Sequence, residues 1–522
     1  MLVVNMFNKN VKCLLNLYKL KLNKRFNHTW IQPEGYRTPI KVYNCVTRQN
    51  EPFIVKNKNF VTWYTCGPTV YDSSHIGHAA CYVRLDIIQK ILKTYFGLNL
   101  VTCMNITDID DKIIQKSIET KTHYKEIAEK YEKEFWQDLK TVGISKPDIV
   151  VRVTEYIPLI IDFIKKLELD GTAYVGKDNS VYFDVSKGCK HYGKLQTITD
   201  SLPDKSNLFK RAPADFALWK IRKSETEPSY PSPWGQGRPG WHIECSSLAS
   251  MIFGNNIDVH AGGIDLRFPH HENEEAQSCS FHGNNQWVNY WIHTGHLHLK
   301  DSVKMSKSLK NTISIKDALE DRTSDVFRFL CATSHYSQPI EYSDELLDTA
   351  ANLLKIFKNF INMCDEIEKG LIKVSLDNTI LNNVIAHSIC EIDKALCDNF
   401  NTPRVVQLLS QNVTKINTMI HVSDKSQVYL DKNFHLLLAF KNIVCSTLSL
   451  FGIDFKGDIQ TANETHSTDV IELLVKFRQN IRLIGLENKN VELLKLCDSV
   501  RDNLNKQGVM VKDHGNVSSW SM

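Results

Sequence analysis

The segments Lys304-Met305-Ser306-Lys307-Ser308 and His75-Ile76-Gly77-His78, far apart in the chain, together decide its fold. The run 61–65 before the histidines predicts a strand, and the run 79–95 after them predicts a helix. The histidines therefore fall on a strand-to-helix turn, where nucleotides bind in doubly wound sheets. Attack on ATP builds negative charge on its phosphates, and histidine and lysine supply the donors and cations that this charge requires. Either segment alone could be an ordinary turn or a solvated loop, but the pair predicts an α/β fold, a Rossmann-like doubly wound parallel sheet that binds ATP.

Length and composition describe a large chain of ordinary globular character. Its 522 residues exceed what one hydrophobic core usually serves, so two or three domains are expected. Hydrophobic residues make up 42% and charged residues 23%, within the usual range for soluble proteins, and the formal net charge is only +4. No uninterrupted apolar run reaches the length needed to cross a bilayer, so no membrane partner is predicted.

The N-terminal segment is basic, and no Asp or Glu precedes Glu34. Its basic residues include Lys9, Lys12, Lys19, Lys21, Lys24 and Arg25. Because an acid-free, basic leader is typical of mitochondrial targeting, residues 1–30 are predicted to direct the protein to the mitochondrial matrix. A secretory signal and a plain N-terminal arm are the alternatives. Lysines interrupt every candidate apolar core of a secretory signal, and no small-residue cleavage site follows one.

The fourteen cysteines are scattered singly, without a Cys-x-x-Cys pair, which argues against a disulfide framework. Most are expected to pack as small hydrophobic side chains. Cys66 follows the predicted strand and Cys245 ends the stretch GWHIEC, while His270 and Glu274 would point the same way on a helix. Together the four side chains form a tetrahedral set suited to zinc. Spacing alone leaves structural roles for all four open.

Several longer stretches follow one another in order between about residues 40 and 345. They are CGPTVYD at 66–72, NITDIDDK at 105–112, DFALWK at 215–220, SPWG at 232–235, GRPGWHIEC at 237–245, FPHHENE at 268–274 and the lysine pentapeptide, with a weaker echo, NFNTP, at 399–403. Through these stretches the chain resembles the cysteinyl-tRNA synthetases, a family of class I aminoacyl-tRNA synthetases, and in particular their mitochondrial forms.

The resemblance implies a ligase that uses ATP to activate L-cysteine as cysteinyl-adenylate and transfers it to the 3′ end of tRNA(Cys) in mitochondrial translation. It also implies one zinc ion per chain, held by Cys66, Cys245, His270 and Glu274, and magnesium accompanying ATP. A hydrophobic site separates near-isosteres such as serine and cysteine poorly, whereas zinc binds a thiolate far more strongly than an alcohol. The protein is expected to act as a monomer.

The same resemblance gives roles to further residues. Gly67, Thr107 and His270 are expected to bind cysteine, with Trp241 covering it, although a core aromatic is the alternative role of Trp241. The implied ATP-binding residues are His75, Gly77, His78, Gly262, Asp265 and Lys307. The implied catalytic residues are His75, His78, Lys304 and Lys307. Asp265 could instead be the N-cap of the helix expected after it.

Two departures from the family pattern are visible. Where many relatives have three consecutive glycines, this chain has Ala261-Gly262-Gly263, and the small alanine is expected to preserve close approach to the adenosine. Gln115 stands where relatives commonly have a second lysine. In the family that lysine-rich segment is linked to a side activity that makes cysteine persulfide with pyridoxal phosphate, so this activity is in doubt here.

The motifs divide the chain into predicted parts. These are a targeting segment at 1–30, the first half of the catalytic domain at 31–115, a connective insertion at 116–210, the second half at 211–300, the lysine loop with linking helices at 301–349, and a helical anticodon-binding domain at 350–522. The insertion is predicted to be mostly helical over 127–169, with a strand at 181–185. Residues 325–349 are predicted to be helical.

In the C-terminal part, amphipathic periodicity alone indicates only a helical bundle, and the position of this part in the chain implies the anticodon-binding role. Apolar residues recur at helical spacing at Leu353, Leu354, Ile356, Phe357, Phe360, Ile361, Val405, Leu408 and Leu409. Residues 458–468 are predicted to be a flexible loop and 506–522 to be loose. Lys476, Arg478 and Arg482 could contact RNA, but a solvated helix face is the favoured interpretation.

Three other functions fit part of the sequence. A cysteine ligase acting on an amino sugar would share the catalytic domain but lack the helical part beyond residue 350. A catalytically inactive RNA-binding relative would not need the intact ATP and zinc motifs. A zinc hydrolase centred on 270–274 would leave the lysine pentapeptide unexplained.

Overall fold

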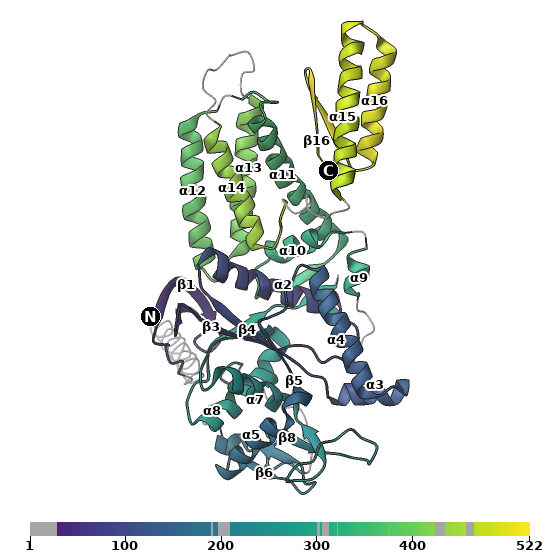
Figure 1. The fold of residues 1–522 in the computed structure, drawn as a ribbon. Coiled ribbons are helices and arrows are strands. Elements are labelled where there is room, and N and C mark those ends of the chain that lie inside the picture. The colour runs from purple at the N-terminus through teal and green to yellow at the C-terminus, as the bar shows by residue number, and fades with distance from the viewer. Residues whose placement is uncertain are drawn as a thin grey trace, which may run out of the picture. The chain divides into compact units, whose positions relative to one another are not determined.

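The computed structural model describes residues 29–188, 192–196, 209–299, 303–304, 313–320, 322–374, 376–422, 434–455 and 464–521 (Figure 1). Two compact units make up the chain. The first comprises residues up to 73, 98–136 and 146–293, and the second 74–97, 137–145 and 294–522. In the part of the chain that the structure describes, no helix is long and apolar enough to span a membrane.

A five-stranded sheet with the order β11-β10-β3-β4-β5 is the centre of the first unit. Its strands are β3 (Val61–Thr65), β4 (Leu100–Ile106), β5 (Ile149–Arg152), β10 (Ile257–Gly263) and β11 (Val288–Thr294). β3 pairs in parallel with both β10 and β4, and β4 with β5. The strand order reverses between β3 and β10, and ligands bind at the carboxyl ends of the strands at such a point. The predicted fold class and the strand 61–65 are confirmed.

Smaller sheets and helices complete the first unit. A hairpin of β1 (Tyr36–Asn44) and β2 (Gln49–Val55) precedes β3, and an antiparallel sheet joins β6 (Ala173–Val175), β7 (Val181–Phe183), β8 (Phe216–Ile221) and β9 (Gly237–Pro239). The helices are α3 (Asp111–Thr120), α4 (Tyr124–Thr141), α5 (Ile157–Leu169), α6 (Val185–Gly188), α7 (Trp241–Phe253) and α8 (Glu272–His282). One buried core includes Phe183, Trp219 and Trp287, so the antiparallel sheet shares its core with the parallel one.

The predicted helices between 127 and 169 are confirmed as α4 and α5, and the predicted strand as β7. The strand β5 between the two helices is a correction. It is only four residues long, and so short an apolar run carries no clear periodicity. Because β5 completes the parallel sheet, this part of the predicted insertion belongs to the nucleotide-binding fold.

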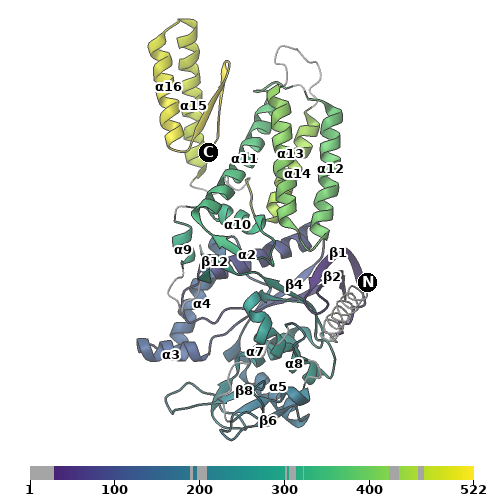
Figure 2. The same ribbon diagram turned by 180° about the vertical axis from the view of Figure 1, so that it is seen from behind.

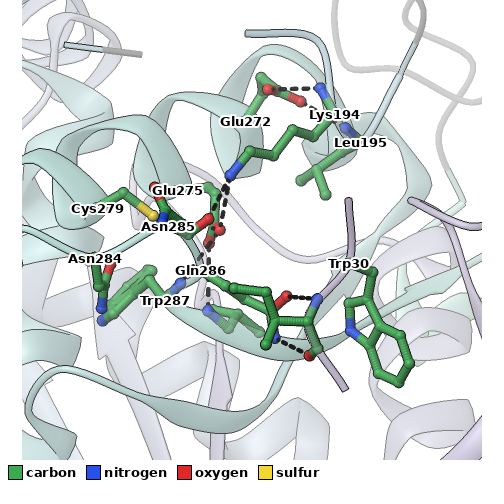
Figure 3. A network of polar contacts seen from close by, with 12 residues as sticks. Trp30, Lys194, Leu195, Glu272, Glu275, Cys279, Asn284, Asn285, Gln286 and Trp287 are labelled. Carbon is green, nitrogen blue, oxygen red and sulfur yellow. Dashed lines mark hydrogen bonds and ion pairs between the residues drawn. The ribbon is translucent and has the colours of Figure 1, made fainter. Parts of the chain in front are cut away.

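Trp30, near the start of the described part of the chain, is held by contacts within the first unit (Figure 3). The indole Nε1 of Trp30 donates to the carbonyl of Asn289 at 2.9 Å, and its ring lies 5.8 Å from that of Tyr290. The next residue, Ile31, exchanges two hydrogen bonds with the side chain of Gln286, of 2.8 and 2.9 Å. Residues 1–28, with most of the predicted targeting segment, lie outside the described residues.

The second unit contains the helix that follows the histidine motif, α2 (Ile76–Lys90), continued by a π-helical turn, η1 (Ile91–Tyr95). The helix predicted up to Tyr95 is confirmed and begins slightly earlier. A small sheet of the order β13-β12-β14 unites β12 (Leu297–Leu299), β13 (Val303–Lys304) and β14 (Ile340–Tyr342). The prediction of helix throughout 325–349 is therefore wrong at β14, although α10 (Ser324–Thr333) precedes it. α9 (Ile315–Ala318) follows the lysine loop.

Arg328 of α10 is a fully buried cation in the second unit. Its Nε donates to the carbonyl of Phe451 at 2.7 Å and its Nη1 to that of Val142 at 2.9 Å, while Nη2 pairs with Asp86 of α2. A buried guanidinium must satisfy its donors locally because water does not reach it. This one side chain therefore connects four separate segments of the second unit.

Four antiparallel helices follow and lie side by side in both views (Figures 1 and 2). They are α11 (Asp344–Glu368), α12 (Asn378–Cys397), α13 (Thr402–Val422) and α14 (His435–Leu450). On α11 the predicted apolar stripe is largely confirmed, since Leu354, Phe357, Phe360 and Ile361 are buried whereas Ile356 is exposed. The bundle is held by the same helix-face packing that the periodicity predicts.

The C-terminal segment is a helix pair, α15 (Glu464–Glu487) and α16 (Val491–Lys506), followed by an antiparallel hairpin of β15 (Met510–His514) and β16 (Val517–Ser521). The prediction that 506–522 is loose is wrong, and α15 already begins inside the predicted loop at 458–468. Arg478 neither faces solvent nor is available to RNA. It is 2% exposed and forms two hydrogen bonds with Asp513, of 2.7 and 3.0 Å.

Because Arg478 and Asp513 form an ion pair, the C-terminal segment is expected to be sensitive to acid. The hydrogen bonds from Arg478 lower the pKa of Asp513 from 3.8 to about 2. A carboxyl group with a lowered pKa stabilises the fold above its unfolded-state pKa, and this stabilisation is lost as it becomes protonated. Between about pH 4 and pH 2 the segment is therefore expected to open. Limited digestion with pepsin, mapped by mass spectrometry, would show cleavage in α16 rising over this range.

The matched variant is Asp513→Asn, which cannot pair as an anion. It should be cleaved in α16 already at pH 5 and show little further change on acidification. Equal cleavage of both proteins at every pH would contradict a stabilising role for the pair.

Candidate active site

The four predicted metal ligands come from three places around the carboxyl ends of β3 and β10. Cys66 directly follows β3, and its backbone N–H donates to Ala261 of β10 at 3.2 Å. Cys245 lies in the second turn of α7. His270 lies in the turn η4 (Arg267–His271), and Glu274 lies in the first turn of α8, so the two are one helical turn apart as predicted.

All four side chains are buried, and their potential ligand atoms lie within 4.8 Å of one another. The two sulfurs of Cys66 and Cys245 are 3.7 Å apart, Cys66 Sγ is 3.6 Å from Glu274 Oε1, and His270 Nε2 is 3.0 Å from the same oxygen. Zn–S bonds of about 2.3 Å in a tetrahedral site require sulfurs about 3.8 Å apart. The residue types and their spacing therefore fit zinc.

The charges of the cluster also favour a cation. Burial raises the pKa values of the Cys66 thiol and the Glu274 carboxyl. Burial is the largest influence on Cys245 and opposes its ionisation, but the hydrogen bond from Cys66 and the interactions with His270 together outweigh it and lower the pKa. Burial lowers the pKa values of His242, His260 and His271. A metal ion binds imidazole in its neutral form, and its positive charge would stabilise the ionised thiol and carboxyl groups, which burial leaves poorly solvated.

Two histidines were not predicted to belong to this site. His260 of β10 and His271 form a second possible set of ligands together with Cys66 and Glu274. His260 Nε2 lies 3.3 Å from Cys66 Sγ and 3.4 Å from Glu274 Oε2. Among the described residues, His260 Nδ1, His271 Nε2 and Glu274 Oε2 are buried polar atoms without a hydrogen-bond partner. His271 follows His270 in the sequence, but only strand pairing brings His260 to Cys66.

The ligands are held by an outer layer of contacts. His270 Nδ1 lies 2.8 Å from Nδ1 of His242, which leaves Nε2 of His270 on the side of Glu274. Such contacts fix the ring and the tautomer of a metal-binding histidine. On α8, Glu272 accepts backbone N–H groups of the segment 193–195 at 2.7 to 2.9 Å (Figure 3). Glu275 accepts from the backbone N–H of Trp287 at 3.2 Å. Both sides of the Glu274 turn are therefore anchored.

Trp241 is not a core aromatic. It is 39% exposed and stacks on the His270 ring, with the ring centroids 4.2 Å apart. Trp241 begins α7 one turn before Cys245, so both residues face His270. The preceding Gly240 is required by close contact, since a Cβ there would lie 2.0 Å from the carbonyl oxygen of Ala217. This placement is compatible with the predicted covering role.

Gly67 and Thr107 lie together at the ends of the adjacent strands β3 and β4. Thr107 N donates to the carbonyl of Pro68 at 3.1 Å, and a parallel bridge joins Thr69 to Thr107. A Cβ on Gly67 would lie 1.7 Å from the carbonyl oxygen of Asn105, so no side chain fits there. Gly67 and Thr107 therefore lie close to Cys66 at the end of the sheet, and their contact with the substrate cysteine stays a prediction.

Gly262 and Asp265 lie at the carboxyl end of β10, Asp265 within the short helical turn η3 (Ile264–Leu266). The N-cap of that turn is Gly263, so Asp265 is not the helix N-cap that was its alternative role. A Cβ on Gly262 would lie 2.9 Å from the Leu266 side chain and 3.1 Å from the His271 ring. The Ala261 substitution is accommodated in a fully buried position.

The histidine motif lies in the second unit. His75 is the N-cap of α2, and its Nδ1 accepts the N–H of Gly77 at 3.1 Å, while Nδ1 of His78 accepts the N–H of His75 at 3.3 Å. The two rings stack with centroids 3.9 Å apart. Because each Nδ1 is an acceptor, each neutral ring carries its proton on Nε2. Both imidazoles are thus arranged as donors.

The histidine motif is also bonded to the end of the lysine loop. Ile76 N donates to the carbonyl of Ile313 at 3.1 Å, and His75 forms an antiparallel bridge with Ser314. The backbone of Lys304 forms part of β13, whereas Lys307 lies outside the described residues. These contacts place the histidine motif beside residues 313 and 314, whereas the predicted pairing with the lysine pentapeptide stays a prediction.

Comparison with known families gives a consistent result. The family model described as "tRNA synthetases class I (C) catalytic domain" matches residues 52–352. A protein of Xenopus tropicalis named "Probable cysteine--tRNA ligase, mitochondrial" is 39% identical over 94% of this chain and 91% of its own length. The "Cysteine--tRNA ligase, cytoplasmic" of Dictyostelium discoideum is 38% identical over 93% of this chain and 78% of its own length.

Solved structures show the same fold at low sequence identity. Mycobacterium tuberculosis methionyl-tRNA synthetase in complex with methionyl-adenylate aligns with a TM-score of 0.56 at 14% identity, over 75% of this chain and 90% of its own. An arginyl-tRNA synthetase structure from Campylobacter jejuni aligns with a TM-score of 0.52 at 15% identity, over 77% of this chain and 94% of its own.

Proposed function

This chain belongs to the class I cysteinyl-tRNA synthetases and is a cysteine–tRNA ligase; we propose from this which of its residues bind each substrate and where in the cell it acts. Cys66, Cys245, His270 and Glu274 hold one zinc ion, and Gly67, Thr107 and Trp241 surround the bound cysteine. The observation that carries this proposal is the buried cluster of these four side chains.

A zinc ion bound there would select the substrate by its thiol, because zinc takes a thiolate in preference to an alcohol. The protein itself orients the remainder of the amino acid. Trp241 excludes water from the His270 side of the site, and Gly67 lets the backbone beside Cys66 pack closely against Asn105. The cysteine carboxylate is thereby presented to ATP.

The histidine and lysine motifs act on ATP. His75 and His78 donate from Nε2 to the phosphates, and Lys304 and Lys307 supply positive charge as pyrophosphate departs, with magnesium on the nucleotide. Gly77, Gly262 and Asp265 contact the nucleoside. The terminal ribose hydroxyl of tRNA(Cys) then attacks the adenylate carbonyl, and AMP leaves. Positioning and electrostatics are sufficient for both steps, without a covalent enzyme intermediate.

The direct test uses the purified chain with ATP, radiolabelled pyrophosphate and one amino acid at a time. Exchange of pyrophosphate into ATP should require cysteine and be negligible with serine. The enzyme should then charge mitochondrial and cytosolic cysteine tRNAs, and the ratio of the two rates shows which translation system it serves. Exchange with serine at a rate near that with cysteine would refute selection through the metal.

The C-terminal helices argue against the amino-sugar ligase, and the buried ligand cluster argues against an inactive RNA-binding relative. An amino-sugar cysteine ligase would not need the four helices α11–α14, and the relatives named as tRNA ligases match this chain over more than nine-tenths of its length. An inactive RNA-binding relative would have no reason to keep the buried ligand cluster intact.

Mitochondrial localisation is the finer part of the proposal. Its support is the acid-free basic leader, which ends where Trp30 is anchored by Asn289. The full chain fused to a fluorescent protein at its C-terminus is expected in mitochondria, and the same fusion beginning at Trp30 in the cytosol. A version with Lys19, Lys21 and Lys24 changed to Glu controls for length and should also stay cytosolic. Cytosolic signal from the full chain would contradict this localisation.

A further inference from the structure

Three consecutive hydrogen bonds link the backbone of Gly67 to the buried side chains of Asn105, Thr107 and Glu244. They lie at the end of the parallel sheet in the first unit. The backbone N–H of Gly67 donates to Asn105 Oδ1 at 3.0 Å. Asn105 Nδ2 donates to Thr107 Oγ1 at 3.4 Å. Thr107 Oγ1 donates to Glu244 Oε2 at 3.1 Å. Asn105, Thr107 and Glu244 are each at most 2% exposed, so these bonds do not compete with solvent.

The direction of each bond follows from the groups themselves. A backbone N–H can only donate, so the Asn105 oxygen must face Gly67 and its NH₂ group must face Thr107. The threonine hydroxyl then accepts from Asn105 and gives its one proton to Glu244. The three side chains therefore form a single connected arrangement, in which loss of one member leaves another buried group without its partner.

The two ends of this series of hydrogen bonds lie next to the two cysteine ligands in the sequence. Gly67 follows Cys66 and Glu244 precedes Cys245 in the sequence. Cys66 lies at the end of β3, whereas Cys245 lies on α7, and the sulfurs are 3.7 Å apart. Asn105 and Thr107, from β4, connect the backbones of both ligand segments. The contacts among the four proposed ligands involve no residue of β4.

We propose that Asn105 and Glu244 are positioning residues for the cysteine substrate. They fix the Thr107 hydroxyl and the Gly67 backbone in relation to the two cysteine ligands, and so set the geometry in which the amino acid binds. Neither residue needs to touch ATP or the metal. This inference rests on the proposed function, because it takes Gly67 and Thr107 as residues that contact cysteine.

The role predicts a selective effect on cysteine binding. In Glu244→Ala the Thr107 hydroxyl loses its acceptor and can rotate, and the KM for cysteine in pyrophosphate exchange should rise about tenfold, the effect of one lost buried hydrogen bond. The KM for ATP should stay within about twofold, because the nucleotide-binding residues keep their contacts. Glu244→Gln keeps an acceptor oxygen in the same place and should restore the KM for cysteine to near the wild-type value.

Thr107→Val and Asn105→Ala test the same connection from its other members. Because Thr107 and Glu244 act through one bond, the double variant Thr107→Val with Glu244→Ala should raise the KM for cysteine no more than the worse single variant. Ser247→Ala is the matched control. Ser247 is equally buried on α7, but its hydroxyl bonds only to carbonyls of its own helix, and its loss should leave the KM for cysteine unchanged.

Zinc content and thermal unfolding of every variant show whether it is folded and loaded. Zinc content should match the wild type, and each variant should unfold in one cooperative transition, at a lower temperature where a buried group has lost its partner. The inference is overturned if Glu244→Gln is as impaired as Glu244→Ala, if the KM values for ATP and cysteine rise together, or if the effects of Thr107→Val and Glu244→Ala simply add. If the wild-type chain itself shows no cysteine-dependent exchange, the proposed function fails, and that result is separate from any comparison among variants.

Discussion

Replacing Cys245 with serine is expected to remove zinc from the protein and to lower kcat/KM for cysteine activation by about a thousandfold. Zinc should fall from one ion per chain to a small fraction, because an alcohol is a weak ligand and three ligands remain. The loss in rate corresponds to about 4 kcal/mol of transition-state stabilisation. Metal content by atomic emission and pyrophosphate exchange measure the two effects.

The substitution should also reduce selectivity. Without a thiolate-binding ion, the site must separate cysteine from serine by size and polarity alone, and binding sites of that kind separate near-isosteres poorly. The ratio of kcat/KM for cysteine to that for serine is therefore expected to fall by at least two orders of magnitude. Misactivation of serine would be measured in the same exchange assay.

Cys279→Ser is the matched control for this substitution. Cys279 is a buried cysteine of α8, on the same helix as Glu274 but in neither set of possible metal ligands. A hydroxyl at this position can still donate to Glu275, as the thiol does. This variant should keep its zinc and its preference for cysteine. Retention of full zinc by Cys245→Ser would contradict the assigned ligand set.

Replacing Lys307 with alanine is expected to abolish cysteine-dependent pyrophosphate exchange while zinc stays bound. The lysine ammonium group stabilises charge that develops only as the phosphate bonds change, and removing one such group typically costs 10²–10³-fold in rate, or about 3–4 kcal/mol. The effect should be on kcat rather than on the KM for cysteine, since the amino acid is held elsewhere. Pyrophosphate exchange and zinc content are measured on the same sample.

Lys310→Ala provides the comparison, because Lys310 follows the pentapeptide and carries the same charge. Its rate of exchange should stay close to that of the wild type. Lys307→Arg keeps the charge but changes its shape, so a partial loss is expected there. Normal exchange in Lys307→Ala would remove the lysine loop from the ATP site.

Sequence identified the residues whose chemical type is unusual for their position. Cys66, Cys245, His270 and Glu274 were identified because they stand in long motifs, and the structure brings the four together. His260 and Asn105 were missed as site residues, although Asn105 begins the stretch at 105–112, since the local sequence does not show what their side chains contact. Their importance depends on which strand lies beside which, and that pairing is not encoded in local spacing.

The fold was predictable where elements are long and periodic. The helices α11 and α13 follow from apolar residues at helical spacing, whereas β5 and β14 are too short to show a period. The hairpin of β15 and β16 did have a signal. Gly515 lies at the turn with a φ of 64°, and the buried Val509 and Val511 alternate with the exposed Met510 before it. The buried role of Arg478 had none, because arginine is normally a surface residue.

The buried Arg328 bears on how this enzyme can be divided. Its guanidinium needs the carbonyl of Phe451, which lies after the last helix of the four-helix bundle, as well as Asp86 from the helix that carries the histidine motif. A version of the chain ended near residue 350 would take away the acceptor of its Nε, while Val142 and Asp86 would still accept from Nη1 and Nη2. The change in sequence pattern at residue 350 therefore does not mark a clean boundary, because a cut there removes one of the contacts that stabilise the helix after the histidine motif.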